Sequence, residues 1–343
     1  MTYDPESDDR LDPRIKAMLA MMPAMEVHDV HSREELVADA ASPQGAAQYA
    51  EMASVMNLAD DETVAPSDAL RFAREDIVSS PDGNTIKLQI IRPDSDETVA
   101  CVYYIHGGGM ASMSSFFGNY RAWGRVIASK GVAVVLVEFR NSVAPSEVPE
   151  VAPYPAGLND CVSGLKWVIE NAATYGIDPG RVIVSGESGG GNLTLALGLK
   201  LKRDGDLGLV KGLYALCPFI AGRWPDDRYP SSVENNGIFI DVHNNLGAVS
   251  YGIDAFNAGD PLAWPGFATA EDVAGFPPTV ISVNECDPLR DEGIAFYRLL
   301  LAAGVLARGR TVLGTCHGAE LFPPLCPEIT HSTAADIAAF AAT

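Results

Sequence analysis

The sequence predicts an α/β fold with a mostly parallel central sheet and helices on both of its faces. Apolar residues form nearly uninterrupted runs at 99–105 and 132–137, which is typical of strands buried on both faces. Stretches with helical spacing, such as 160–171 and 192–202, lie between runs of this kind. Strands that alternate with helices along the chain indicate a parallel sheet wound with helices.

Each element follows from its local pattern. Residues 85–91 alternate between apolar and polar side chains, as a half-buried strand does. Apolar runs predict the remaining strands at 99–105, 132–137, 182–185, 213–216, 279–283 and 311–313. Helices are expected at 160–171, 192–202, 291–303 and 329–342.

The chain is expected to carry two additions to this sheet. Residues 1–70 contain helical patterns, for example Tyr49, Met52 and Met56, and no strand pattern. Residues 219–266 interrupt the alternation with aromatic residues, prolines and asparagines. We therefore expect a helical N-terminal cap segment at 1–70 and a catalytic domain at 71–343, with a cap insertion at about 219–266.

Composition excludes several classes of function. The 343 residues carry a formal net charge of −21 and no cluster of lysine and arginine, which argues against nucleic acid or an anionic membrane as a partner. The N-terminus starts acidic rather than basic, and no apolar run approaches the roughly 20 residues of a spanning helix. We expect a cytoplasmic protein whose partner is a small molecule, with a homodimer possible.

A nucleophile is indicated at Ser188. The segment from Gly186 to Gly190 reads G-E-S-G-G and matches G-x-S-x-G. This match alone is weak, because glycine is 32 of 343 residues. Its context strengthens it, since an expected strand ends just before it and an expected helix follows, which is the strand, sharp turn and helix of a nucleophile elbow. A plain glycine turn is the alternative, and no Walker phosphate-loop pattern is present.

A glycine-rich loop supplies candidate oxyanion donors. His106, Gly107, Gly108 and Gly109 follow the strand expected at 99–105. Backbone N–H groups in such a loop stabilise negative charge on a reacting carbonyl oxygen, and one donor is typically worth about 3 kcal/mol. We assign Gly108, Gly109 and Gly189 as donors, with Gly107 as an alternative to one of them. His106 is expected to organise the loop.

His317 is the best candidate for the general base. An acid and then a histidine follow the serine in proteins with this kind of elbow. His243 lies in the expected insertion, and His331 lies in the expected C-terminal helix. His317 instead follows the strand expected at 311–313, where a loop can present it.

Asp287 is the best candidate for the acid, because it follows the strand expected at 279–283. There it can hold His317 in the productive tautomer. Asp291 and Glu292 are the alternatives, although both are expected to begin a helix. Asp160 precedes the serine and is expected to cap a helix.

The remaining candidates are less specific. Substrate binding is assigned to Met110, Glu187, Phe219 and Trp264. Aromatic residues of the insertion are expected to wall a shallow apolar pocket, although core packing is an alternative for most of them. The spacing of His28 and His31 suggests a metal only faintly, so neither a metal nor a cofactor is expected.

Two of the six cysteines lie next to residues of the expected site. Cys286 and Cys316 each precede a candidate triad residue by one position. A disulfide between them is conceivable, but packing as free thiols is expected in a cytosolic protein.

These motifs together resemble the bacterial hormone-sensitive-lipase-like family of esterases. The resemblance rests on the sequences around Gly108 and Ser188, on D-P-L-R-D-E-G from Asp287 onward, and on His317 followed by glycine. It covers the chain from about residue 70 to its end and implies a capped α/β-hydrolase fold, a serine triad and carboxylesterase activity without a cofactor. The chain lacks the family's arginine-leucine-alanine-proline run at 141–154, and Ala319 replaces the usual phenylalanine.

A short acyl group or a lactone is the expected substrate, cleaved through an acyl-enzyme. Two alternatives stay open at this stage. One is amide hydrolysis on the same fold, and the other is a non-catalytic ligand-binding receptor, although receptors of this kind lose a triad residue.

Overall fold

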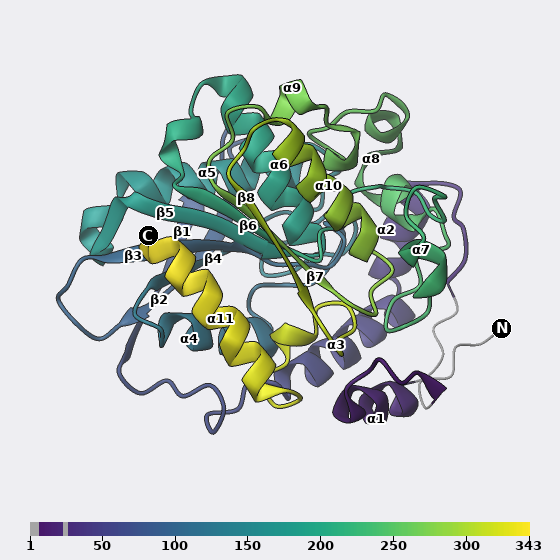
Figure 1. The fold of residues 1–343 in the computed structure, drawn as a ribbon, viewed down its shortest axis with the longest axis horizontal. Coiled ribbons are helices and arrows are strands. Elements are labelled where there is room, and N and C mark those ends of the chain that lie inside the picture. Colours follow the sequence, from purple (N-terminus) through teal and green to yellow (C-terminus); the bar gives the residue numbers. More distant parts are fainter. Residues whose placement is uncertain (1–6, 23–26) are drawn as a thin grey trace.

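A mixed sheet forms the centre of the molecule (Figure 1). The computed structural model describes residues 7–22 and 27–343, so residues 1–6 and 23–26 of the expected N-terminal segment lie outside the described residues. Within them the sheet has eight strands in the order β1-β2-β4-β3-β5-β6-β7-β8. The pairs β1–β2 and β2–β4 are antiparallel, and the other pairs are parallel. The predicted α/β class is confirmed.

The strands and helices have the following bounds. The strands are β1 (Leu70–Val78), β2 (Thr85–Pro93), β3 (Val99–Ile105), β4 (Ala133–Glu138), β5 (Ile177–Glu187), β6 (Gly212–Leu216), β7 (Thr279–Asn284) and β8 (Ala307–Val312). The helices are α1 (Pro13–Met21), α2 (Arg33–Ala41), α3 (Pro43–Asn57), α4 (Gly118–Ala128), α5 (Ala156–Glu170), α6 (Gly189–Asp204), α7 (Ser231–Glu234), α8 (Leu246–Asn257), α9 (Ala270–Val273), α10 (Arg290–Ala302) and α11 (Pro327–Ala342).

Both faces of the sheet are covered by helices. In Figure 1, α4 and α11 lie on one side of the sheet, and α5, α6 and α10 lie on the other. Side chains of β3 alternate between the two layers, as the period of a strand requires. Tyr103 packs in the layer that contains α5 and α6, whereas Tyr104 packs in the layer that contains α4 and α11. The sheet is therefore a rigid base for the loops at its strand ends.

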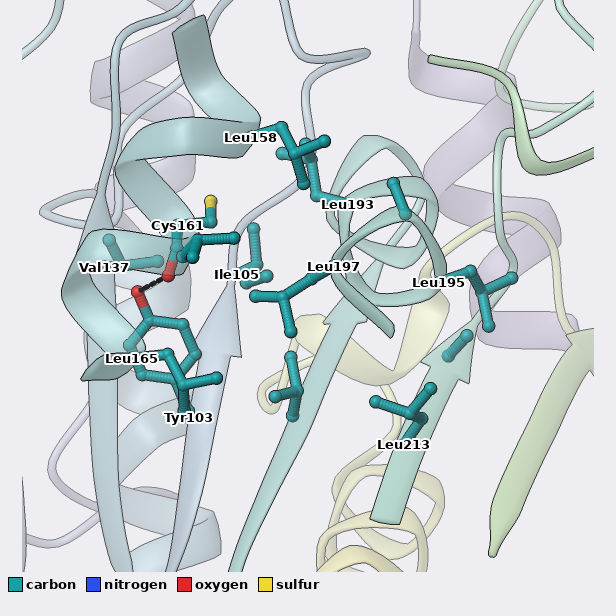
Figure 2. Close-up of a cluster of buried hydrophobic side chains, with 14 of the residues drawn as sticks. Tyr103, Ile105, Val137, Leu158, Cys161, Leu165, Leu193, Leu195, Leu197 and Leu213 are labelled. Atoms are coloured by element: carbon teal, nitrogen blue, oxygen red, sulfur yellow. Dashed lines mark hydrogen bonds between the residues drawn. The ribbon is translucent and has the colours of Figure 1, made fainter. Parts of the chain in front are cut away.

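The layer between the sheet and helices α5 and α6 is a dense apolar cluster (Figure 2). Leu165 of α5 and Leu197 of α6 are fully buried in it. Figure 2 also shows a hydrogen bond in this cluster, in which the Tyr103 hydroxyl donates to the Cys161 carbonyl oxygen at 2.9 Å. Because α6 begins directly after Ser188, this packing also fixes where the serine stands.

The edges of the sheet depart from the sequence prediction. β1 was not expected, because its charged, largely exposed side chains show no apolar alternation and its place is set by pairing with β2. At the other edge, β8 is also largely polar, and only its last residues fell within the apolar run used to predict it. No helix among the described residues combines the length and apolar character that crossing a membrane requires.

The N-terminal helices contact the insertion. Helix α2 lies against α8, and Asn245 at the start of α8 exchanges two hydrogen bonds with the backbone of Val30. Leu36 of α2 and Met56 of α3 line the same cavity as residues 239–250. Both segments thus meet over one end of the sheet.

Candidate active site

Ser188 occupies a strained turn between β5 and α6. Its backbone has φ 55° and ψ −118°, a conformation that costs a non-glycine residue energy. Close backbone packing explains the glycines beside it, since a Cβ on Gly190 would lie 2.0 Å from the Ile105 carbonyl oxygen. Helix α6 accordingly begins at Gly189, three residues earlier than its sequence pattern indicates. The turn places Ser188 on the wall of a cavity.

His317 and Asp287 form a buried pair. Asp287 follows β7 and His317 follows β8. The His317 ring nitrogen Nδ1 lies 2.8 Å from Asp287 Oδ2, and Asp287 Oδ1 accepts a bond from the Leu289 N–H. His317 lines the same cavity as Ser188. The three predicted catalytic residues therefore follow three parallel strands of one sheet, β5, β7 and β8, with β6 between the first two.

The carboxylate of Asp287 controls the charge of the imidazole. Burial alone would lower the pKa of His317, but the charge of Asp287, together with the neighbouring Cys217 and the hydrogen bond to Asp287, outweighs this effect and raises that pKa well above 6.5. An imidazole with a raised pKa is a stronger base, so this pairing suits a group that must accept a proton from a hydroxyl.

The alternative acids have other partners. Asp291 accepts the Ser231 N–H and pairs with Arg290. Glu292 accepts the N–H groups of residues 220 and 221 and the indole N–H of Trp224. Burial raises the pKa of Glu292 to about 8, although these bonds act against the shift. Glu292 therefore anchors the start of the insertion.

Asp160, which was expected to cap a helix, makes structural contacts instead, and so do histidines other than His317. Asp160 does not cap a helix, because it lies inside α5 and forms an ion pair with Arg140. His243 and His331 contact the backbone carbonyl oxygens of Ser232 and Val64. His106 is fully buried and stacks on Phe139 at 4.3 Å.

The glycine loop touches the serine turn. Gly108 and Gly109 have φ values of 88° and 62°, the left-handed region that glycine tolerates without strain. A Cβ on Gly189 would lie only 2.8 Å from the Gly109 nitrogen and 2.6 Å from the Met110 nitrogen. The backbone nitrogens of the loop thus converge on the start of α6, where a helix N-terminus adds its own positive dipole.

Glu187 holds this loop in place. Its carboxylate accepts hydrogen bonds from the Gly107 N–H and from the hydroxyls of Tyr104 and Tyr120, each at 2.6 Å. Burial raises the pKa of Glu187 to about 7, while the tyrosine hydrogen bonds counteract the rise. Because the Gly107 N–H is committed to Glu187, it is not available as an oxyanion donor. The carboxylate of Glu187, assigned to substrate binding from sequence, faces the loop.

The cavity has a volume of about 500 Å³ and largely apolar walls. Phe219 lines it and stacks on Trp224 at 4.6 Å. Trp264 and Met110 are buried and are not among the described residues that line it, although Trp264 packs against Phe219. Trp264 therefore supports the cavity wall through its contact with Phe219.

Sequence reasoning missed part of this wall. Val27, Leu36, Leu321 and Phe322 line the cavity but were not singled out. The last two lie a few residues beyond His317, and that proximity was a usable signal. Nothing in the sequence around Val27 and Leu36 distinguishes a residue that lines a cavity from one that packs against its neighbours.

The cysteines are free. All six are buried thiols, so Cys286 and Cys316 form no disulfide. A third thiol, that of Cys217, lies beside the pair of Asp287 and His317. Sequence reasoning gave Cys217 no part in the site.

Comparisons with known proteins agree on one family and one activity. A family model described as the α/β hydrolase fold matches residues 102–321. Esterase LipI of Mycobacterium tuberculosis is 32% identical over 262 residues, which are 74% of this chain and 76% of LipI. Esterase Est22 is 58% identical, with a TM-score of 0.98 over 100% of this chain and 99% of Est22. Brefeldin A esterase, described as a bacterial homologue of human hormone sensitive lipase, is 34% identical, with a TM-score of 0.86 over 99% of this chain and 95% of that one.

Proposed function

This chain belongs to the α/β hydrolase fold family and is a carboxylic ester hydrolase, and we propose that it works through a triad of Ser188, His317 and Asp287. The observation that carries the proposal is the 2.8 Å contact of His317 Nδ1 with Asp287 on a cavity that Ser188 also lines. Structures of the similar esterase Est22 include a mutant named S188A and a complex with p-nitrophenol. The mutant supports a serine mechanism, and the complex supports a p-nitrophenyl ester as the probe.

The proposed reaction has two acyl-transfer steps. His317 Nε2 takes the hydroxyl proton of Ser188 as the oxygen attacks the ester carbonyl, and Asp287 stabilises the imidazolium that forms. The alcohol leaves with the proton from His317. Water, activated by the same ring, then attacks the acyl-enzyme and releases the acid.

The oxyanion rests on backbone donors in this proposal. Gly108, Gly109 and Gly189 present their N–H groups where the carbonyl oxygen acquires negative charge. Support comes from the close approach of Gly189 to the Gly109 nitrogen and from the bond that occupies the Gly107 N–H.

Short or compact acyl groups are the acyl class that we propose. Its aromatic wall is backed by buried Trp264, so Phe219 has little room to move aside for a long chain. We propose acetyl to butyryl esters, or lactones of similar bulk, as the substrate class. The partner is then a small ester, whereas a cytoplasmic location and a homodimer stay predictions.

A substrate panel tests this function. In a series of p-nitrophenyl esters we expect kcat/KM to be highest between acetate and butyrate and at least about tenfold lower for decanoate. The panel includes lactones, macrolides and a p-nitroanilide to detect an amidase. A maximum at long acyl chains contradicts the substrate class, and failure of a fluorophosphonate probe to label the protein contradicts the serine mechanism.

The loop network makes a second prediction. Tyr120→Phe removes a hydroxyl that donates to Glu187 and accepts from the Gly107 N–H, which loosens the glycine loop and should lower kcat about three- to tenfold with little change in KM. Tyr103→Phe is the control, because it also loses a buried tyrosine hydroxyl, one that bonds to the Cys161 carbonyl oxygen in the layer of α5 rather than to Glu187. Both variants should lose about 1 kcal/mol in free energy of unfolding. Equal kcat values for the two variants would rule out a positioning role for the network.

A further inference from the structure

A buried thiol lies against the proposed acid and base. Cys217 directly follows β6, as Asp287 and His317 follow the next two strands of the sheet. One sulfur, one carboxylate oxygen and one ring nitrogen of these residues lie within 4.8 Å of one another. All three side chains are buried, with exposed fractions of 0%, 0% and 7%. Among the described residues this is the one such group of three potential metal ligands.

The three donors are held by the backbone around them. The Cys217 N–H donates to the Ser282 carbonyl oxygen at 2.7 Å, and its φ of 33° is unusual for a residue with a side chain. Asp287 is fixed by the Leu289 N–H and by His317. Little ordering entropy therefore remains to be lost if an ion binds between them.

The donor set fits a borderline-soft cation. Thiolate, imidazole and carboxylate are the ligands that Zn²⁺ takes in proteins, and three of them leave a fourth position open. Donor atoms around a tetrahedral zinc ion lie about 3.3–3.8 Å apart, so small side-chain rotations suffice. The thiolate of Cys217 and the carboxylate of Asp287 neutralise the two charges of the ion. His317 lines the cavity, which provides an entry path.

We propose that Cys217, Asp287 and His317 form a binding site for one thiophilic divalent cation, Zn²⁺ or Cd²⁺, and that the bound ion inhibits ester hydrolysis. The thiol of Cys217 and the protonated ring of His317 each lose a proton to solvent. The sulfur, a nitrogen lone pair of the ring and a carboxylate oxygen of Asp287 then bind the cation. The ring can then no longer both pair with Asp287 and accept the Ser188 proton. The inhibition rests on the proposed triad, whereas the binding does not.

Binding and inhibition should change with pH in a defined direction. Burial raises the pKa of Cys217 to about 11, so the thiol is protonated at neutral pH. Each ion that binds must displace that proton and the proton of the His317 ring, whose pKa is also raised, and the apparent affinity therefore rises with pH. We expect the inhibitory concentration to fall severalfold for each pH unit between 6 and 8.

The test is a titration of the reduced protein with CdCl₂. We follow the ultraviolet absorption of the cadmium–thiolate bond and, in parallel, the turnover of p-nitrophenyl acetate. The wild type should bind one ion with this absorption and lose activity that a chelator restores. In Cys217→Ser the absorption should be absent and the inhibitory concentration at least tenfold higher. Cys326→Ser, which removes a buried thiol from another part of the chain, should behave like the wild type.

The outcomes separate the site from the triad. Inhibition of Cys217→Ser at wild-type cadmium concentrations, or inhibition of the wild type without the thiolate absorption, overturns the site. One bound ion with the absorption but full activity supports the site and contradicts His317 as the base. If the serine variant does not fold, Cys217→Ala and the stoichiometry of the wild type decide the question.

Discussion

Replacement of Ser188 by alanine is expected to reduce the turnover of p-nitrophenyl acetate by at least about 10⁴-fold. Alanine keeps the backbone turn and removes only the hydroxyl that forms the acyl bond. The His317–Asp287 pair and the glycine loop remain, so substrate binding should change little. The measurement is kcat/KM of the purified variant, with an unchanged thermal unfolding curve as evidence that the fold is intact.

Ser185 offers a matched control on the strand that precedes Ser188. It is fully buried in β5, and its hydroxyl has no hydrogen-bond partner among the described residues. Ser185→Ala should therefore retain activity within about twofold and lose little stability. Wild-type turnover by Ser188→Ala, or an equal loss in both variants, would refute Ser188 as the nucleophile.

Features that residues adjacent in the chain specify were predictable from the sequence. The strand, turn and helix around Ser188 were predictable because the glycines and apolar runs that specify them are adjacent in the chain. Asp287 and His317 were selected by their order and their position after strands, and the structure places them 2.8 Å apart. The family resemblance to hormone-sensitive lipase is also confirmed.

Features set by contacts between distant segments were not predictable in this way. β1 is a strand because β2 provides its partner, and its own charged sequence does not indicate one. The roles of Glu187 and Cys217 depend on β3, α4 and β8, which are brought close only in the fold. Leu36 reaches the cavity because α2 packs on α8.

Replacement of Asp287 by asparagine should lower kcat about 10³- to 10⁴-fold near neutral pH. The side chain remains in place, but an amide N–H that faces His317 Nδ1 favours the tautomer with its proton on Nε2. That tautomer cannot accept the proton of Ser188. The variant also leaves the imidazolium without its buried counter-charge, which raises the energy of the transition state.

The same substitution has a signature in the pH profile. Activity requires a neutral His317, so kcat/KM of the wild type should rise as pH increases through the raised pKa of this ring. Loss of the carboxylate charge removes the largest effect that raises the pKa of His317, so this pKa falls. The acidic limb of the profile should therefore move to lower pH in Asp287→Asn, even though its plateau is far below that of the wild type.

Asp291→Asn is the control that separates a triad acid from a nearby acidic residue. Asp291 lies four residues further along the chain and pairs with Arg290 and the Ser231 N–H instead of His317. Its replacement should leave both kcat and the pH profile within about twofold of the wild type. If Asp291→Asn moved the acidic limb and Asp287→Asn did not, the acid would have to be reassigned, because the carboxylate that faces the ring has the largest effect on the pKa of His317.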